Sequence, residues 1–284
     1  MELFTIEQLE RCEGYLAQGA YDQILPRLQD MAGDAQAFID ETYEPSDKVQ
    51  WFSFSSQFEL LTYKRVEDDP REIRPADAPF DRLFADLGFC LMRLERYEEA
   101  TEGLKQAVRW NPMECAHRLN LASALAQAGD YEEYLRMTYS VFDRASHSQH
   151  LARAYENFAG YFIDCEQPDT AAACVKCGLA LVPDDERLTR IGDGLALNHQ
   201  RDWREQPDDL TESLLGAQGI PTGANVEVAI SALLLADISA ANGDAQTADD
   251  MNAIVVDLMG PDRAVTLARM VAQATAGRDA GEGE

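Results

Sequence analysis

Apolar residues recur three and four positions apart along almost the whole chain, a spacing that places them on one face of an α-helix. Runs in which Val, Ile or Thr alternate with polar residues, as in a half-buried strand, are absent from the sequence. The pattern therefore predicts an all-α fold. With 284 residues, of which 46% are hydrophobic, the chain is long enough to fill a substantial core.

The segment from Asp81 to Pro112 predicts two antiparallel helices joined by a short turn, RLERYEEA. Two such helices approach closely only where a small residue, here Gly88 or Ala100, admits the backbone of the other helix. Pro112 ends the second helix. The residues that share one face are Phe84, Leu87, Gly88 and Leu91 on the first helix and Ala100, Leu104 and Ala107 on the second.

The same unit recurs twice further along the chain. At a shift of 34 residues the small residue of the first helix is Ala122, and the turn AQAGDYEEY echoes RLERYEEA. The second helix of this copy departs from the pattern, and Ser146 stands in place of the proline. A third copy, 37 residues further, has Ala159 on its first helix and Gly178 on its second, and it ends at Pro183.

These three units resemble the tetratricopeptide repeat (TPR), in which an aromatic residue, Leu-Gly and a bulky residue precede a second helix with Ala, Leu, Ala and a final Pro. The resemblance is specific for residues 80–185. Three consecutive units suit the family, because one hairpin cannot bury its own apolar face and stacking supplies the remaining cover. The resemblance implies a right-handed superhelix of antiparallel helical hairpins, a TPR-like α-solenoid.

The segment before the repeats, residues 1–66, predicts an N-terminal capping region. Its first part is a helical hairpin that turns at residues 18–20. Its second part is a helix over 46–65, opened by Ser46 as the N-cap, with an aromatic stripe that we interpret as core or, if exposed, as a partner surface. Residues 67–79, which include DDPREIRPADAP, predict a linker.

The segment after the repeats, residues 186–276, predicts a C-terminal helical region. It contains a helix around 185–197, an irregular stretch over 199–225, a repeat-like hairpin (226–241 and 248–259) and a capping helix over 261–276. This region either continues the superhelix or forms a separate bundle from about residue 208. Residues 277–284 predict a disordered tail.

The chain carries a net charge of -27, from 51 acidic and 24 basic residues. Nucleic acids and anionic membranes are bound mainly through Lys and Arg, so the charge disfavours both as partners. The acidity favours solubility or, alternatively, a basic partner. It is densest from Glu205 to Asp262, which holds eleven acidic residues and no Lys or Arg.

The sequence opens with an acidic amphipathic pattern, MELFTIEQLERCEG, instead of the basic and apolar start of a signal peptide. The longest apolar run, ALLLA, is too short to span a bilayer. We therefore expect a cytoplasmic protein whose six cysteines are free thiols in helix faces. Cys174 and Cys177 form a CxxC within a predicted helix, and without a second ligand pair we interpret them as core residues.

Motifs typical of catalysis are absent from the sequence: there is no GxxxxGK[ST] or GxGxxG, no HExxH and no GxSxG. His147 and His150 could share one helix face, but they flank a turn rich in Ser and Arg. Acidic pairs such as Glu98-Glu99 lie at turns or helix starts, where the helix dipole favours negative charge. We therefore expect no enzyme, no catalytic or metal-binding residue and no cofactor.

The TPR resemblance implies that a partner binds in the concave groove lined by the first helix of each hairpin. The inward-facing candidates are Arg82, Asp86, Phe89, Arg93, Asn120, Ser123, Gln127, Arg153 and Asn157. Arg and Asn in a groove suit an acidic or C-terminal peptide. The family's clamp for a terminal carboxylate is incomplete, because Ala85 and Phe89 occupy places that need Lys and Asn. In the alternative, the chain's own N-terminal helix or a neighbour fills the groove.

Three functions are compatible with these patterns. The leading hypothesis is a scaffold or adaptor that captures a protein or peptide segment in the groove. The second is a TPR-type chaperone for a secreted or aggregation-prone client, and the third is a sensor or enzyme that binds a metal ion through the acidic C-terminal block. The sequence leaves the identity of the partner and the oligomeric state open.

Overall fold

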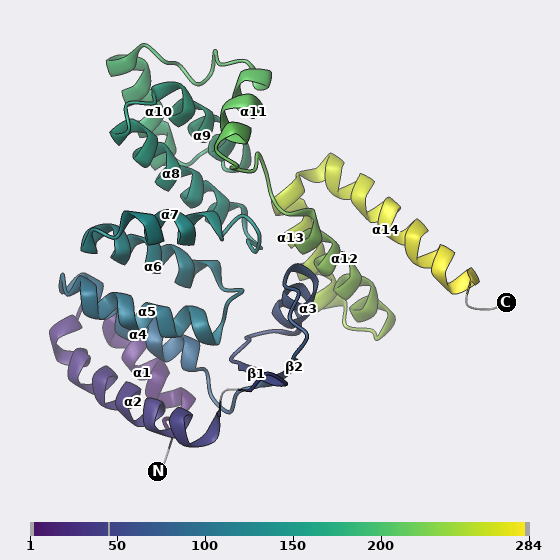
Figure 1. The fold of residues 1–284 in the computed structure, drawn as a ribbon. Helices are drawn as coiled ribbons and strands as arrows, with labels where there is room; N and C mark the ends of the chain where they lie inside the picture. The colour runs from purple at the N-terminus through teal and green to yellow at the C-terminus, as the bar shows by residue number, and fades with distance from the viewer. Residues whose placement is uncertain (1–2, 45, 282–284) are drawn as a thin grey trace. The chain divides into compact units, whose positions relative to one another are not determined.

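The structure, a computed structural model, describes residues 3–44 and 46–281, with side chains as far as residue 274. Within that part, 14 helices pack against their neighbours in sequence, and two short strands form a parallel sheet (Figure 1). This confirms the predicted all-α class. The chain divides into unit 1, Met1–Met137, and unit 2, Thr138–Glu284, and the boundary falls inside the segment predicted as repeats.

Unit 1 begins with the predicted helical hairpin. Thr5 caps the first helix, because its hydroxyl accepts from the Gln8 amide and its own amide donates to the Gln8 side chain. The chain reverses at Gly19, whose φ of 74° favours glycine. The elements of unit 1 are α1 (Ile6–Ala17), α2 (Tyr21–Thr42), β1 (Val49–Phe52), α3 (Gln57–Val66), β2 (Glu72–Pro75), α4 (Phe80–Arg93), α5 (Tyr97–Trp110), α6 (Cys115–Ala128) and most of α7 (Tyr131–Tyr139).

Helices α4 and α5 form the first predicted repeat hairpin, and glycines mark the place where they pack most closely. A Cβ on Gly88 would lie 2.5 Å from Cγ of Leu104 and 3.2 Å from the carbonyl oxygen of Ala100. On the facing helix, a Cβ on Gly103 would lie 3.4 Å from the backbone nitrogen of Gly88. The predicted close approach at Gly88 is confirmed.

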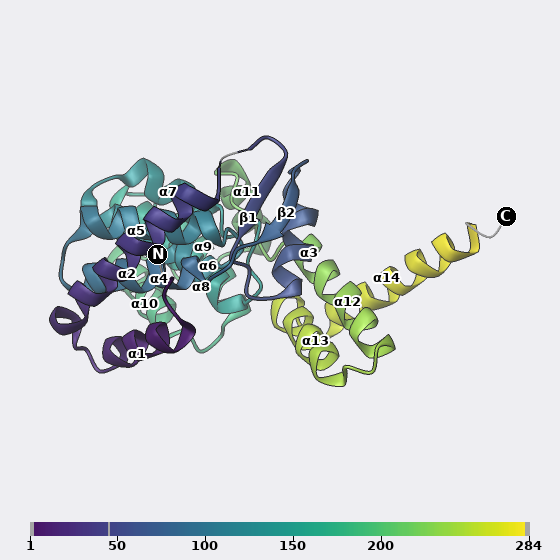
Figure 2. The same ribbon diagram turned by 90° about the horizontal axis from the view of Figure 1, so that it is seen from below.

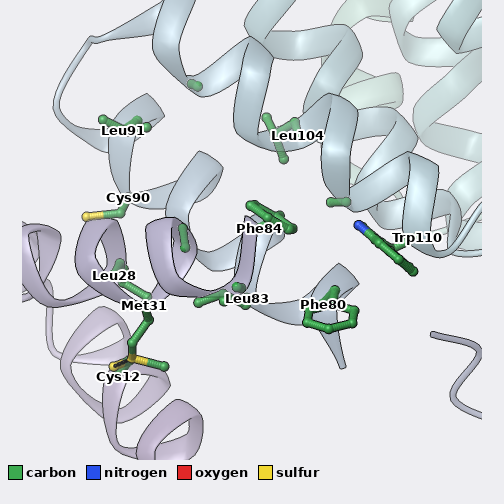
Figure 3. Close-up of a cluster of buried hydrophobic side chains, with 14 of the residues drawn as sticks. Cys12, Leu28, Met31, Phe80, Leu83, Phe84, Cys90, Leu91, Leu104 and Trp110 are labelled. Carbon is green, nitrogen blue, oxygen red and sulfur yellow. Dashed lines mark hydrogen bonds between the residues drawn. The ribbon is translucent and has the colours of Figure 1, made fainter. Parts of the chain in front are cut away.

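The core of unit 1 lies among α1, α2, α4 and α5 (Figure 3). Figure 3 shows Leu28 and Met31 of α2 facing Leu83 of α4, with Leu104 and Trp110 of α5 on the other side of α4. Leu28, Leu83 and Leu104 are fully buried. One face of α4 is therefore covered by the chain's own N-terminal helices.

The predicted helix over 46–65 is wrong in its first half. Residues 49–52 form β1, which pairs in parallel with β2 inside the predicted linker, and α3 begins only at Gln57. Ser56 caps α3 by accepting from the Glu59 amide. The side chains of Ser53, Ser55 and Ser56 compete for backbone hydrogen bonds, which favours a loop and a helix start over a helix interior.

The aromatic stripe predicted on that helix is consequently split. Phe52 packs with Tyr63 and Phe54 in a small cluster next to the sheet, whereas Trp51 packs against the main core. Phe58 is buried on α3. Figure 2 shows β1 and β2 side by side, next to α3. The interpretation of these aromatic residues as packing residues holds for Phe52, Phe58 and Tyr63, but they do not share one helix.

Unit 2 contains two hairpins of the predicted kind, α8 (Ser148–Asp164) with α9 (Pro168–Leu181) and α12 (Val226–Ala241) with α13 (Ala245–Met259). Asp257 of α13 accepts from both the amide and the hydroxyl of Ser148, each at 2.7 Å, and so caps α8. This capping joins the third predicted repeat to the C-terminal region within one unit. The other helices of unit 2 are α10 (Glu186–His199), α11 (Asp208–Ala217) and α14 (Pro261–Gly281).

Two C-terminal boundaries differ from the prediction. The stretch over 199–225 contains the ten-residue helix α11, which packs on α9 and buries Leu215 and Thr211. Helix α14 continues past the predicted end at Ala276 to Gly281. The last three residues of the predicted tail, 282–284, lie outside the described residues.

All six cysteines are free, and all but Cys165 are buried. Burial raises the pKa of the Cys174 thiol well above its usual range and that of Cys177 to about 11. The interpretation of this CxxC as core is confirmed. In the part of the chain that the structure describes, no helix has the length and apolar character needed to cross a membrane.

Candidate functional site

A pocket of about 480 Å³ lies in unit 1, where the ends of several elements meet. Its lining comes from the end of β1 and the chain after it (residues 52–55), the end of β2 and the chain after it (residues 75–79), the first turns of α4 and α6, and Asn111 directly after α5. The volume lies within the usual range of ligand pockets in proteins, about 300–1,000 Å³. We therefore treat this pocket as the candidate site.

Ser53 fixes the loops around the pocket. Its amide donates to the carbonyl oxygen of Trp110 at 2.8 Å, and its hydroxyl donates to the carbonyl oxygen of Ala78 at 2.9 Å. The same hydroxyl accepts from the amide of Phe80 at 3.2 Å, and this hydrogen bond connects the first turn of α4 to the loop after β1. Three distant segments are thereby held at one place.

The buried centre of the site is Asp81, of which 4% is exposed. Its Oδ2 accepts from Nδ2 of Asn111 at 3.3 Å and lies 3.4 Å from Nε2 of His117. Its Oδ1 accepts no hydrogen bond from any residue that the structure describes. An unmatched oxygen on a buried carboxylate is destabilising unless a donor outside the described residues reaches it.

Asn111 links Asp81 to a second carboxylate, that of Glu59. Nδ2 of Asn111, itself 1% exposed, also lies 3.2 Å from Oε1 of Glu59, so one amide bridges two acidic side chains. Glu59 further accepts from the amide and the hydroxyl of Ser55, at 2.6 and 3.0 Å. Burial raises the pKa of Glu59 above its usual range, although these hydrogen bonds oppose the shift.

Two more acidic residues line the pocket. Glu114 is the N-cap of α6, where its Oε1 accepts from the amide of Ala116 at 2.8 Å. Asp77 accepts from the hydroxyl of Tyr43 at 2.8 Å. The lining also has an apolar part, because it includes Phe52 at the end of β1 and Phe54 in the loop that follows, with ring centroids 4.8 Å apart.

The predicted groove residues of α4 mostly contact the N-terminal helices. Arg82 forms an ion pair with Glu13 of α1 at 2.6 Å. The ring of Phe89 packs edge-on against Tyr21 of α2, and the guanidinium of Arg93 lies 5.4 Å from the centroid of the same ring. These contacts match the alternative in which the chain's own helices fill the groove, and of these α4 residues only Arg82 lines the pocket.

Asp86, the fourth predicted residue of α4, is half-buried near Glu13 and Arg82. Its Oδ2 has no hydrogen-bond partner within the described part of the chain. Burial and, after it, the charge of Glu13 raise the pKa of Asp86 to about 7, while Arg82 opposes the shift. The folded state therefore holds a proton on Asp86 at a pH where the unfolded chain has lost it.

This shift predicts a pH dependence of stability. Because the folded pKa is raised, the folded state binds more protons than the unfolded one between about pH 4 and pH 7, and stability falls as the pH rises through that window. Asp86→Asn should remove the fall and stabilise the chain by about 2 kcal/mol at about pH 8, a value reduced for partial exposure. Urea denaturation at several pH values measures the effect. Parallel pH profiles for the two proteins would contradict it.

The other predicted groove residues lie on two helices in different units. On α6, Ser123 donates to the carbonyl oxygen of Leu119 at 2.9 Å, Asn120 is half-buried and Gln127 is exposed. On α8, Arg153 is half-buried, and burial lowers its pKa. The Asn157 amide donates to the buried Thr138 hydroxyl at 3.2 Å, so it supports the packing of unit 2.

Across the described residues, no group of three or more His, Cys, Asp or Glu side chains is arranged to hold a metal ion. The rings of His147 and His150 lie 5.6 Å apart at the start of α8.

Apart from Arg82, sequence reasoning missed the polar residues in and next to this pocket. No spacing rule relates the four residues Glu59, Asp81, Asn111 and His117. Asn111 and His117 are close in sequence, and every other pair is separated by 22 to 58 positions. The available signal was Asn111 before Pro112, because an Asn directly after a helix commonly turns its side chain back onto the backbone. Asn111 does this here by accepting from the amides of Met113 and Glu114.

Comparison with known proteins finds no family model that matches the chain and no curated protein that matches it. The assignment of function therefore depends on the residues and their geometry.

Proposed function

We propose that this chain is a TPR-like interaction protein that binds a segment of another protein, with the pocket of unit 1 as its binding site. The observation that carries the proposal is Asp81, a buried carboxylate with one oxygen unmatched among the described residues, in the wall of a pocket built from the ends of hairpin helices. The charged and aromatic lining suits one side chain of an extended peptide.

The lining also favours a scaffold or adaptor over a chaperone. A chaperone for aggregation-prone clients needs a broad apolar surface, whereas this pocket combines the rings of Phe52 and Phe54 with several carboxylates. Binding without catalysis and a cytoplasmic location belong to the same proposal. The free and mostly buried thiols support that location, and the net charge of -27 supports a protein partner over nucleic acid or membrane.

Selection of peptides on the full chain tests the proposal. A phage-displayed library of random peptides is panned against the whole protein, and enriched peptides are measured by fluorescence anisotropy. Hydrogen exchange of the chain with and without peptide then locates the site. We expect slower exchange in the loops after β1 and β2 and in the first turn of α6. A library without enriched peptides would overturn the proposed function.

A groove variant distinguishes the pocket from the family's usual surface. Arg153→Glu reverses a charge on the predicted groove of α8 and leaves every pocket residue in place. We expect peptide affinity to change by less than about twofold, because Arg153 is not part of the pocket lining and a charge that does not contact the ligand is weakened by salt screening. Loss of binding in this variant, with exchange protection on α8, would move the site to the groove.

A further inference from the structure

We infer that the group bound in the unit 1 pocket is a positively charged side chain, arginine or lysine, of the partner segment. This inference rests on the proposed function and adds the chemistry of the guest. It reverses the expectation from the sequence, in which arginines of the groove receive an acidic peptide.

The charges around the pocket support a cationic guest. Three carboxylates line it, those of Asp77, Asp81 and Glu114. A fourth, that of Glu59, accepts a hydrogen bond from the lining residue Asn111. Of the described residues that line the pocket, Arg82 is the one permanent cation, and its guanidinium is already paired with Glu13. The acidic side chains therefore outnumber the cations available to balance them.

Asp81 specifies the kind of contact. Its Oδ2 is engaged by Asn111 and His117, whereas Oδ1 accepts from nothing in the described part of the chain. A guanidinium or ammonium group in the pocket carries several N–H donors and no acceptor, and it would place an opposite charge beside this carboxylate. An acidic guest would instead add a negative charge beside several carboxylates.

The aromatic wall suits the rest of such a side chain. Phe52 and Phe54 line the same pocket as the carboxylates, and the ring of Phe52 packs against that of Tyr63 at a centroid distance of 4.8 Å. Arg and Lys pack their aliphatic stems along apolar surface while the charged end reaches polar groups. A cation within about 6 Å of a ring face gains a further attraction.

The groove offers no comparable site for an acidic guest on α4. Arg82 is paired with Glu13, and the guanidinium of Arg93 lies over the ring of Tyr21. Both cations are thus used in holding α4 to the N-terminal helices. In the pocket, by contrast, Asp81 is a buried carboxylate with an oxygen that no described residue matches.

The test compares three capped pentapeptides on the full chain: Gly-Gly-Arg-Gly-Gly, its citrulline counterpart and its glutamate counterpart. Citrulline keeps the shape of arginine and removes its charge. Nuclear magnetic resonance titration of the isotope-labelled protein gives the affinities. We expect the citrulline peptide to bind about fivefold more weakly or worse, and the glutamate peptide to produce no shifts at pocket residues.

Variants of the protein tie the effect to the pocket. Asp81→Asn should weaken the arginine peptide about fivefold or more, whereas Asp30→Asn, which removes an equal charge from an exposed position on α2, should leave its affinity unchanged. Since Asp81→Asn could fail to fold, Glu114→Gln is the second variant. Glutamine keeps a side-chain oxygen that can cap α6, so this variant removes the charge and preserves the cap.

The outcomes separate the two proposals. Equal binding of the arginine and citrulline peptides, or unchanged binding by both pocket variants, overturns the cationic guest. If selected peptides nevertheless protect the pocket from exchange, the proposed function stands and only the chemistry of the guest is wrong. If no peptide binds in either experiment, both proposals are wrong.

Discussion

Replacing Trp110 by alanine should lower the free energy of unfolding by about 4 kcal/mol, the largest effect that we expect from one substitution in this chain. The side chain is 1% exposed at the end of α5. Figure 3 shows Trp110 next to Phe80. The ring centroid of Trp110 lies 4.8 Å from that of Phe80 and 5.4 Å from that of Tyr43, so truncation leaves a cavity between α4 and the end of α2. Urea denaturation followed by far-ultraviolet circular dichroism measures the loss.

Trp110→Phe is the matched control. The indole Nε1 of Trp110 donates to no acceptor in the described part of the structure, so phenylalanine removes volume without removing a hydrogen bond. We expect it to cost about half as much as alanine. The alanine variant should also weaken peptide binding, because collapse around the missing ring would shift the end of α5, where the backbone carbonyl oxygen of residue 110 accepts from the Ser53 amide. A cost for Trp110→Ala below about 1 kcal/mol would contradict this account of the core.

Gly88→Ala should destabilise the chain by about 2–3 kcal/mol through overpacking. The new Cβ would lie 2.5 and 2.9 Å from Cγ and Cδ2 of Leu104, distances at which something must shift. Leu104 is fully buried and Ala100 lies on the same side, so the leucine has little room to move. Helices α4 and α5 would have to separate, and the same denaturation experiment detects the change.

Gly33→Ala provides the opposite result in the same unit. Gly33 lies in the interior of α2, and a Cβ there would meet nothing within 4 Å. Alanine should stabilise this helix by about 0.5–1 kcal/mol. The difference in sign between the two glycine variants isolates the helix crossing from the general preference of helices for alanine. Similar effects of both substitutions would show that Gly88 is not at a tight contact.

The hairpins could be predicted because their signals are local. Apolar spacing and a small residue at position 88 determine a helix face and a close approach, whatever the rest of the chain does. The hairpin turning at residues 18–20 and the helix over 226–241 were found in the same way. The TPR assignment and the binding groove remain predictions, because they come from resemblance.

The failures occurred where tertiary contacts decide. Residues 49–52 have the apolar content of a helix, but β2, which pairs with them, supplies backbone partners that only a strand can use. Helix α11 was missed because prolines and glycines surround it, although α9 gives Leu215 a surface to cover. Short elements depend on such contacts more than on intrinsic propensity.

The sequence by itself determined the all-α class, the repeat-like hairpins and an acidic surface, since each follows from composition or from spacing within one helical turn. Only the tertiary structure decided that Arg82 and Arg93 contact the N-terminal helices, and that Asp81, Asn111 and His117 meet beside one pocket. The reason is physical. Long-range contacts depend on how whole elements pack, and packing places in one site residues that no local pattern connects.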